Sequence, residues 1–386
     1  MRYSKLVRSI SIRKKAKHLR PTLFLFLFFL SIVSITDRVY AQNDVNLPTT
    51  LTYEGEVKNV VEEVKNNNGG YYQKLEIEIL DRDLRGKVLD VENGSVETPV
   101  SQKYKKGDTL VLTGFKDDSG EVRLYVNDYV RRGQLLSLFL IFLVLSIAVA
   151  GKRGVTSFIG MAVTFFIIFS LVLPKISTGS NPILVIFIFS LLTIPITFYL
   201  SHGLNKKTTV AVVGTFISLL ITVVLSVIYV HSAKLTGYTT DEAAFLQIMK
   251  GGTMNMRGIL LAGIIIGFLG VLDDITVSQS AIVFQLKSAN KKMGFSELFT
   301  RSMDIGRDHI SSMINTLVLV YAGASLPLLL LFIDSSKTFG EVINYEIISS
   351  EIIRTLLGSI GLIIAVPITT VIAALVASNL DEKIPS

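Results

Sequence analysis

Apolar runs close to the length needed to cross a bilayer recur along the last two thirds of this 386-residue chain. A helix needs about 20 mostly apolar residues to span the hydrocarbon core. Half of all residues are hydrophobic, which is more than a soluble protein of this length carries. Irregular backbone and open sheets cannot face lipid because their polar groups would stay unpaired. We therefore predict a polytopic α-helical membrane protein embedded in a lipid bilayer.

The apolar runs predict about seven spanning helices within a bundle that covers residues 131–386. Pro195 and Pro367 fall inside two of these runs, where a kink is expected. The expected limits of the spans are 135–150, 155–173, 182–200, 208–231, 258–285, 310–333 and 352–377.

Residues 1–41 have the pattern of a signal sequence. A basic region with eight Lys or Arg among the first 20 residues precedes an apolar stretch from Leu23 to Ile35, and a small residue follows at Ala41. An uncleaved anchor helix is the alternative. Either interpretation places the next segment outside the cytoplasm.

Residues 42–130 are polar and predict a small extracytoplasmic β domain. Leu75, Ile77 and Ile79 alternate with Glu76 and Glu78, which is the pattern of a half-buried strand. The segments 109–113 and 122–126 repeat this alternation. Several short strands separated by Gly- and Asp-rich turns favour a sandwich or a small barrel, and an OB-like barrel is one candidate.

The charges of the loops predict the orientation of the bundle. With the β domain outside, cytoplasmic loops are richer in Lys and Arg than outer loops, as the positive-inside rule requires. This orientation agrees with the signal sequence and places the C-terminus in the cytoplasm. The basic residues of the expected cytoplasmic loops are Lys152, Arg153, Lys206, Lys207, Lys287, Lys291, Lys292, Arg301 and Arg307.

Composition also excludes several kinds of chemistry. The chain has no Cys, so disulfides, thiolate metal sites and cysteine nucleophiles are absent. Its four His lie on different segments, and we expect no cofactor; the sequence does not identify a metal. The net charge of +7 comes largely from the first 20 residues, which we interpret as a targeting signal and not as a nucleic-acid surface.

Two adjacent carboxylates, Asp273 and Asp274, are the only charges between Gly258 and Leu286, and they lie close to the middle of that span. A carboxylate at such depth costs roughly 2.5–3.5 kcal/mol, so it usually faces protein or water and has a function. Neighbouring residues of a helix point about 100° apart, so the two side chains cannot share one narrow seam. We expect them to bind a proton, a cation or a cationic substrate, with Ser278 and Gln279 completing a polar cavity; a purely structural pair is the alternative.

Three glycines precede this pair in the same span. Gly263 and Gly267 form a GxxxG pair, and Gly270 follows three residues later. Small residues at such spacing let another helix approach closely, so we expect helix packing on this face.

A second cluster of polar residues lies where the span 310–333 is expected to begin on the cytoplasmic side. It consists of Asp304, Arg307, Asp308 and His309. Asp304 lies at helical spacing from Arg307 and Asp308. The cluster is either a salt-bridged helix cap or a cytoplasmic gate for Asp273 and Asp274.

Several segments resemble the YibE/F family of bacterial multi-pass membrane proteins. The similarity extends from about residue 53 to residue 377. The family resemblance implies an integral protein of the bacterial inner or plasma membrane and assigns no catalytic residue. It is carried by segments such as VNDYVRRGQL (126–135), GKRGVTSFIGM (151–161), LAGIIIGFLGVLDDITVSQ (261–279), RSMDIGRDHISSMINTL (301–317) and GSIGLIIAVPITT (358–370).

The residues favour a transporter or permease-like function that uses the Asp pair and an ion or small-molecule substrate. The alternative is a non-transporting envelope scaffold or sensor whose outer domain binds a partner. We do not expect an enzyme, because no second deep Asp, nucleotide-binding loop or Ser–His–Asp arrangement is recognisable. The sequence leaves the substrate and any oligomeric state open.

Overall fold

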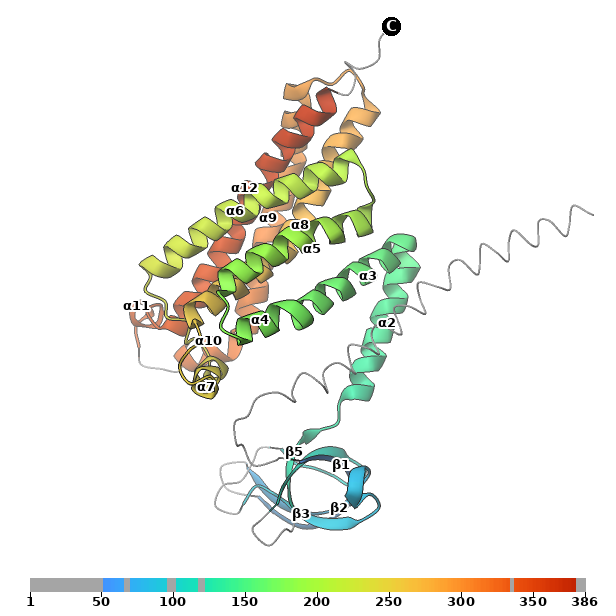
Figure 1. The fold of residues 1–386 in the computed structure, drawn as a ribbon, viewed down its shortest axis with the longest axis vertical. Helices are drawn as coiled ribbons and strands as arrows, with labels where there is room; N and C mark the ends of the chain where they lie inside the picture. Colours follow the sequence, from blue (N-terminus) through green and yellow to red (C-terminus); the bar gives the residue numbers. More distant parts are fainter. Residues whose placement is uncertain (1–50, 66–69, 96–101, 117–121, 334–336, 380–386) are drawn as a thin grey trace, which may run out of the picture. The chain divides into compact units, whose positions relative to one another are not determined.

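The computed structural model describes residues 51–65, 70–95, 102–116, 122–333 and 337–379 (Figure 1). The predicted signal sequence lies outside these residues. The described residues divide into two compact units, and the division falls between Val149 and Ala150. One unit holds a β-barrel and the helix that follows it, and the other holds the remaining helices.

The barrel unit is built from five strands. They close in the order β1-β2-β3-β5-β4, so a barrel, and not a sandwich, is present. All pairings are antiparallel except the one between β3 and β5. The strands are β1 (Leu51–Lys65), β2 (Tyr71–Ile79), β3 (Val88–Asn93), β4 (Thr109–Lys116) and β5 (Val122–Tyr129).

Alternating side chains fill the interior of the barrel. Leu75, Ile77 and Ile79 are all fully buried, as the sequence predicts, while the glutamates between them are half-buried. Period-2 alternation places successive side chains on opposite faces of a strand, which explains this pattern. The other fully or almost fully buried residues of this core are Tyr53, Val57, Val91, Tyr104, Leu110 and Leu112.

Helix α2 (Arg132–Ala150) follows β5 and belongs to the barrel unit, whereas the sequence prediction grouped it with the bundle. None of its residues is buried by the described part of the chain. Its apolar side chains are therefore exposed along the whole helix, as suits a helix surrounded by lipid.

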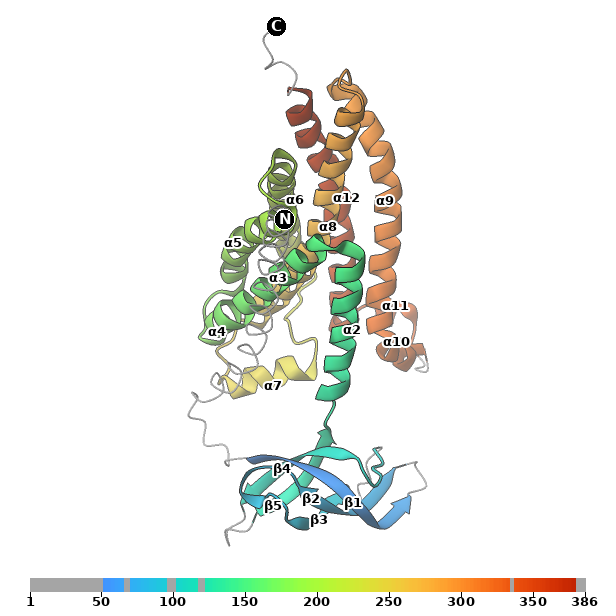
Figure 2. The same ribbon diagram turned by 90° about the vertical axis from the view of Figure 1, so that its right-hand side faces the viewer.

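The second unit is entirely helical in the described residues (Figure 2). Asn181, Asn205, Thr240 and Asn255 cap four of its helices by accepting hydrogen bonds from first-turn N–H groups, which explains where these helices begin. The elements are α3 (Lys152–Ile167), η2 (Ile168–Val172), α4 (Leu173–Ser177), α5 (Pro182–His202), α6 (Lys206–Ser232), α7 (Asp241–Met249), α8 (Met256–Ala289), α9 (Phe295–Ala324), α10 (Leu326–Ile333), α11 (Phe339–Val342) and α12 (Glu346–Ser378).

A π-helical turn, η2, joins α3 to α4. The sequence prediction ended this span at residue 173, before Pro174, but the helix continues to Ser177. A proline cannot donate an i→i−4 hydrogen bond, and its ring clashes with the preceding turn. The wider π turn directly before Pro174 accommodates both effects, so Lys152–Ser177 forms one continuous candidate span.

The span predicted at 310–333 is wrong in its limits. Helix α9 begins fifteen residues earlier, at Phe295, and a break at Ser325 separates it from α10 with a bend of 68°. The segment 295–309 is amphipathic and therefore escapes a hydropathy criterion, although it is helical. The break lies two residues before Pro327, which has no N–H to donate to the carbonyl oxygen of Gly323 and whose ring would clash with that turn, so the helix cannot continue straight through it.

Helices α6, α8 and α12 pack against one another and form the centre of the helical unit. Helix α9 packs mainly on α12, and α5 lies between α3 and α8. In the described part of the chain, six helices are long and apolar enough to cross a membrane, or seven when the bent pair α9–α10 counts as one span. Helix α8 contacts α5, α6, α9 and α12, and these contacts fix the position of the residues that it carries.

Candidate functional site

Asp273 and Asp274 lie at the middle of the 34-residue helix α8. Asp274 is exposed, whereas Asp273 is half-buried, so the two side chains occupy different faces as expected. Neither carboxylate has a hydrogen-bond or ion-pair partner among the described residues. Two carboxylates at this position therefore retain their capacity to accept a proton or a cation.

The glycines that precede the pair share the exposed face of α8 with Asp274. Gly263, Gly267 and Gly270 are all exposed. A Cβ atom built on Gly263 or Gly270 would meet no described atom within 4 Å, and one on Gly267 would meet only the Tyr321 hydroxyl at 3.5 Å. Within one copy of the chain, these glycines do not bring a neighbouring helix close, contrary to the expectation from the GxxxG spacing.

Close helix contacts occur at three other glycines. A Cβ on Gly214 would lie 2.5 Å from the Thr369 hydroxyl, and one on Gly306 would lie 2.7 Å from Val366. A Cβ on Gly361 would lie 2.0 Å from the Phe268 ring. The absence of a side chain at these three positions lets α6, α8, α9 and α12 approach one another.

Gln279 does not join the Asp pair. Five residues of helix rotate the side-chain direction by about 500°, so Gln279 points about 140° away from Asp274. Its buried amide nitrogen donates to the carbonyl oxygen of Ser302 at 2.9 Å and to the hydroxyl of Thr370 at 2.7 Å. Gln279 thus connects α8, α9 and α12, while Ser278 stays half-buried on the side of Asp274.

Some polar atoms around Gln279 are buried without a partner among the described residues. They are the side-chain oxygens of Gln279 and Ser302. A nearby pair is satisfied: the hydroxyls of Thr215 and Thr276 lie 2.7 Å apart and connect α6 to α8. Buried polar contacts therefore connect α6, α8, α9 and α12 in this part of the helical unit, and two buried oxygens remain without a partner among the described residues.

The cluster at Asp304 lies on an exposed face of α9. Arg307 donates to Asp304 at 2.7 Å, as its helical spacing predicts, and both side chains are more than half exposed. Asp308 is exposed and His309 is half-buried, and neither has a partner among the described residues. The opposite face of the same turn, at Gly306, contacts Gln279, so the structure does not direct this cluster toward Asp273 and Asp274.

An ion pair on α12 escaped the sequence analysis. Arg354 donates to Glu351 at 2.8 Å, and both side chains are less than one third exposed. The Nε atom of Arg354 is buried without a partner among the described residues. Arg354 falls inside the expected span 352–377. An arginine in an apolar span, three residues after Glu351, could have predicted this ion pair from the sequence.

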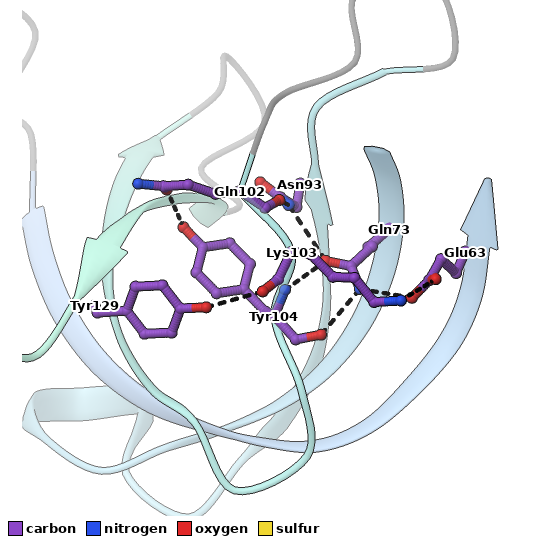
Figure 3. Close-up of polar contacts among 7 residues, drawn as sticks. All are labelled: Glu63, Gln73, Asn93, Gln102, Lys103, Tyr104 and Tyr129. Atoms are coloured by element: carbon purple, nitrogen blue, oxygen red, sulfur yellow. Dashed lines mark hydrogen bonds and ion pairs between the residues drawn. The ribbon is translucent and has the colours of Figure 1, made fainter. Parts of the chain in front are cut away.

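The barrel contains a polar cluster of its own (Figure 3). Gln73 is fully buried, donates to Glu63 and to the carbonyl oxygen of Tyr104, and accepts from the Tyr104 N–H at 2.8 Å. Tyr104 in turn donates to Gln102, and Tyr129 donates to the carbonyl oxygen of Lys103. These bonds fix the segment 102–104 to the strands.

Two ionisable groups of this cluster are shifted in opposite directions. The hydrogen bond from Lys103 lowers the pKa of the Glu63 carboxyl. Burial raises the pKa of Tyr104 to about 12. Both shifts favour an ionised Glu63 and a neutral Tyr104. We interpret this cluster as a structural one, because its members bond to one another.

Comparison with known proteins gives one family. A family model described as YibE/F-like protein matches residues 138–379, which is more than half of the chain and excludes the barrel. No curated protein and no solved structure matches. The matched range includes α8 with its Asp pair and all helices of the helical unit. The chain belongs to the YibE/F-like protein family.

Proposed function

We propose that this integral membrane protein is a transporter in which Asp273 and Asp274 bind a proton, a cation or a cationic substrate. The observation that carries the proposal is the position of these carboxylates: both lie at the middle of a candidate span, and neither has a partner among the described residues. An unpaired carboxylate at the middle of a span is costly, so a bound proton or cation would stabilise it.

We infer different roles for the two residues from their difference in exposure. Asp274 lies on the open face of α8, where water or a solute reaches it first. Asp273 is half-buried and would hold a proton or cation that has lost part of its hydration. The glycines on the same face leave room beside Asp274 for a solute, because no described atom fills the space above Gly263 and Gly270.

The proposed topology has seven spans, with α9 and α10 together forming a bent sixth span. In this arrangement the barrel, which we infer to be OB-like from its five strands, lies outside the cytoplasm of a bacterial cell. The C-terminus then lies in the cytoplasm. The excess of Lys and Arg in the alternate loops supports this orientation.

The decisive experiment uses the purified protein reconstituted into liposomes. Internal pH and the fluxes of a panel of monovalent and divalent cations are followed under gradients of both signs. We expect flux in the wild type and a fall to the protein-free background in the double variant Asp273→Asn with Asp274→Asn. The single variants separate the two roles: Asp273→Asn should abolish coupling, while Asp274→Asn should mainly slow entry.

A matched control pair exists on α7. Asp241 and Glu242 are also adjacent acidic residues, but they lie on a nine-residue helix that is too short to span a membrane. Asp241→Asn with Glu242→Gln removes the same charge and should leave flux unchanged. Absence of flux from well-folded wild-type protein would overturn the proposal and favour the scaffold or sensor, whose barrel should then be crosslinked to its partners.

A further inference from the structure

A hollow with a volume of about 460 Å³ lies at one end of the helical unit, between the start of α6 and the end of α12. Most of its exposed lining is apolar. Leu204, in the turn between α5 and α6, lines it and is 84% exposed. The lining residues are Leu204, Asn205, Lys206, Thr209, Val210 and Val376.

Positive charge lies at one side of this hollow and near the end of α5. Lys206 lines it, and Lys207 and Arg153 lie close enough for their charges to act on His202, at the end of α5. None of Lys206, Lys207 and Arg153 forms a salt bridge in the part of the chain that the structure describes. The end of the helical unit therefore presents cations that no described carboxylate neutralises.

The turn that carries Leu204 and Lys206 is held in one conformation. Asn205 accepts hydrogen bonds from the N–H and the hydroxyl of Thr208, and its own amide donates to the carbonyl oxygens of His202 and Gly203. Gly203 has a φ of +79°, a conformation that glycine adopts at no steric cost. A preformed site needs little ordering when its ligand binds, which favours affinity.

We propose that this hollow binds an anionic phospholipid. The headgroup phosphate would contact the Lys206 side chain and the N–H groups of Lys206 and Lys207, which precede the N–H of Thr208 that Asn205 caps. One acyl chain would lie along Leu204, Val210 and Val376. The hollow lies at the end of two candidate spans, α6 and α12, so it meets the membrane interface whichever side of the bilayer it faces. The proposal does not depend on transport by Asp273 and Asp274.

The apolar lining selects a lipid over a free phosphate. A soluble phosphate would gain only the contacts of the lysine and the helix N-terminus, and it would leave the hollow beside them unfilled. A phospholipid fills both parts, because an acyl chain gains from burial of its CH₂ groups while the headgroup gains from the charges. We therefore expect little binding of inorganic phosphate or glycerol phosphate at this site.

Native mass spectrometry of the detergent-purified full chain tests the proposal. Phosphatidylglycerol is titrated against phosphatidylcholine of the same acyl chains, and bound lipid is counted. We expect tighter binding of phosphatidylglycerol by the wild type. Lys206→Gln with Lys207→Gln should weaken it about 10- to 30-fold, because each basic residue near an anionic headgroup contributes roughly a factor of five.

The control removes the same charge at another turn. Lys291 and Lys292 are exposed between α8 and α9, and neither lines the hollow. Lys291→Gln with Lys292→Gln should leave the affinity for phosphatidylglycerol within about twofold of the wild type. Leu204→Ser keeps every charge and should weaken both lipids, since it removes an acyl contact.

Two results would overturn the proposal. One is an equal loss of phosphatidylglycerol in the two lysine variants, which would indicate diffuse electrostatic attraction. The other is equal affinity of the wild type for both lipids. A melting temperature and a gel-filtration profile like those of the wild type establish that each variant is folded. We expect all variants to fold, because three of the four lysines are exposed and Lys207 is half-buried.

Discussion

Gly361 on α12 lies against Phe268 on α8 so closely that a Cβ atom at Gly361 would be 2.0 Å from the end of the phenylalanine ring. The hydroxyl of Thr222 on α6 approaches the same point to 2.5 Å. One hydrogen atom in place of a methyl group thus lets the three central helices meet. No GxxxG spacing marks Gly361, although its Cβ position has the shortest of these distances among the helical glycines.

Gly361→Ala should destabilise the protein by about 1–3 kcal/mol, because the added methyl group overpacks the contact of the three helices. Gly358→Ala on the same helix is the control, since a Cβ there would meet nothing within 4 Å. Alanine also favours a helix by about 1 kcal/mol over glycine, so the control should be neutral or stabilising. Thermal unfolding in detergent measures both, and equal melting temperatures would refute the contact.

The hydroxyls of Thr215 and Thr276 should be energetically coupled across α6 and α8. Each hydroxyl also lies within bonding distance of a carbonyl oxygen of its own helix, that of Ala211 for Thr215 and that of Leu272 for Thr276. A hydroxyl has one proton, so the threonine that donates to the other helix gives up the bond within its own helix. We expect a coupling energy of about 0.6 kcal/mol, the typical value for hydrogen bonds between membrane helices. A double-mutant cycle with Thr215→Val and Thr276→Val measures it, and strictly additive effects would show that the two hydroxyls do not bond.

Gln73→Leu should destabilise the barrel by about 2–4 kcal/mol, because it leaves the N–H and the carbonyl of Tyr104 buried without their partner. The control is Lys74→Gln on the same strand, which breaks an exposed ion pair with Asp90 and should cost less than about 1 kcal/mol. Limited proteolysis of the full chain, followed at the barrel, compares the two. Equal cleavage rates would indicate that the polar cluster does not stabilise the barrel.

Alkaline pH should weaken the barrel through Tyr104. Burial raises the pKa of this tyrosine from 10.0 to about 12 in the folded protein. Its neutral form therefore contributes stability that is fully present below pH 10 and is lost as pH rises through about 12. Tyrosine ionisation is followed by the absorbance at 295 nm as the pH is raised. The difference between the titration curves of the wild type and of Tyr104→Phe should show one ionisation near pH 12. In concentrated urea the same difference should move to about pH 10; a step near 10 in the folded protein would contradict the burial.

The presence of a helix can be predicted from this sequence more readily than the residues at which it begins and ends. The apolar runs at 182–200, 208–231 and 258–285 are long enough that no other structure can hold them in lipid, and α5, α6 and α8 extend only a few residues beyond them. Helix α9 was misplaced because residues 295–309 are too polar for a hydropathy criterion and are stabilised instead by packing of one face, at Ser302 and Gly306.

The candidate site was only partly predictable for a similar reason. The centre of α8 could be read from the sequence because charge is rare in such a run. The residues that contact α8 from other helices could not be predicted, since these contacts depend on the angles at which the helices cross. Helical rotation alone, however, would have separated Gln279 from Asp274 and brought Glu351 together with Arg354.

The central position of the Asp pair on α8 has a mechanical consequence. With 34 residues and a rise of about 1.5 Å per residue, α8 is about 51 Å long, well beyond a hydrocarbon core of roughly 30 Å. Such a helix adapts to thinner or thicker bilayers by tilting. Tilting about the midpoint displaces Met256 and Ala289 in opposite directions but leaves Asp273 and Asp274 where they are. A pair at the midpoint of such a helix would keep its depth in bilayers of different thickness if the helix adapts by tilting.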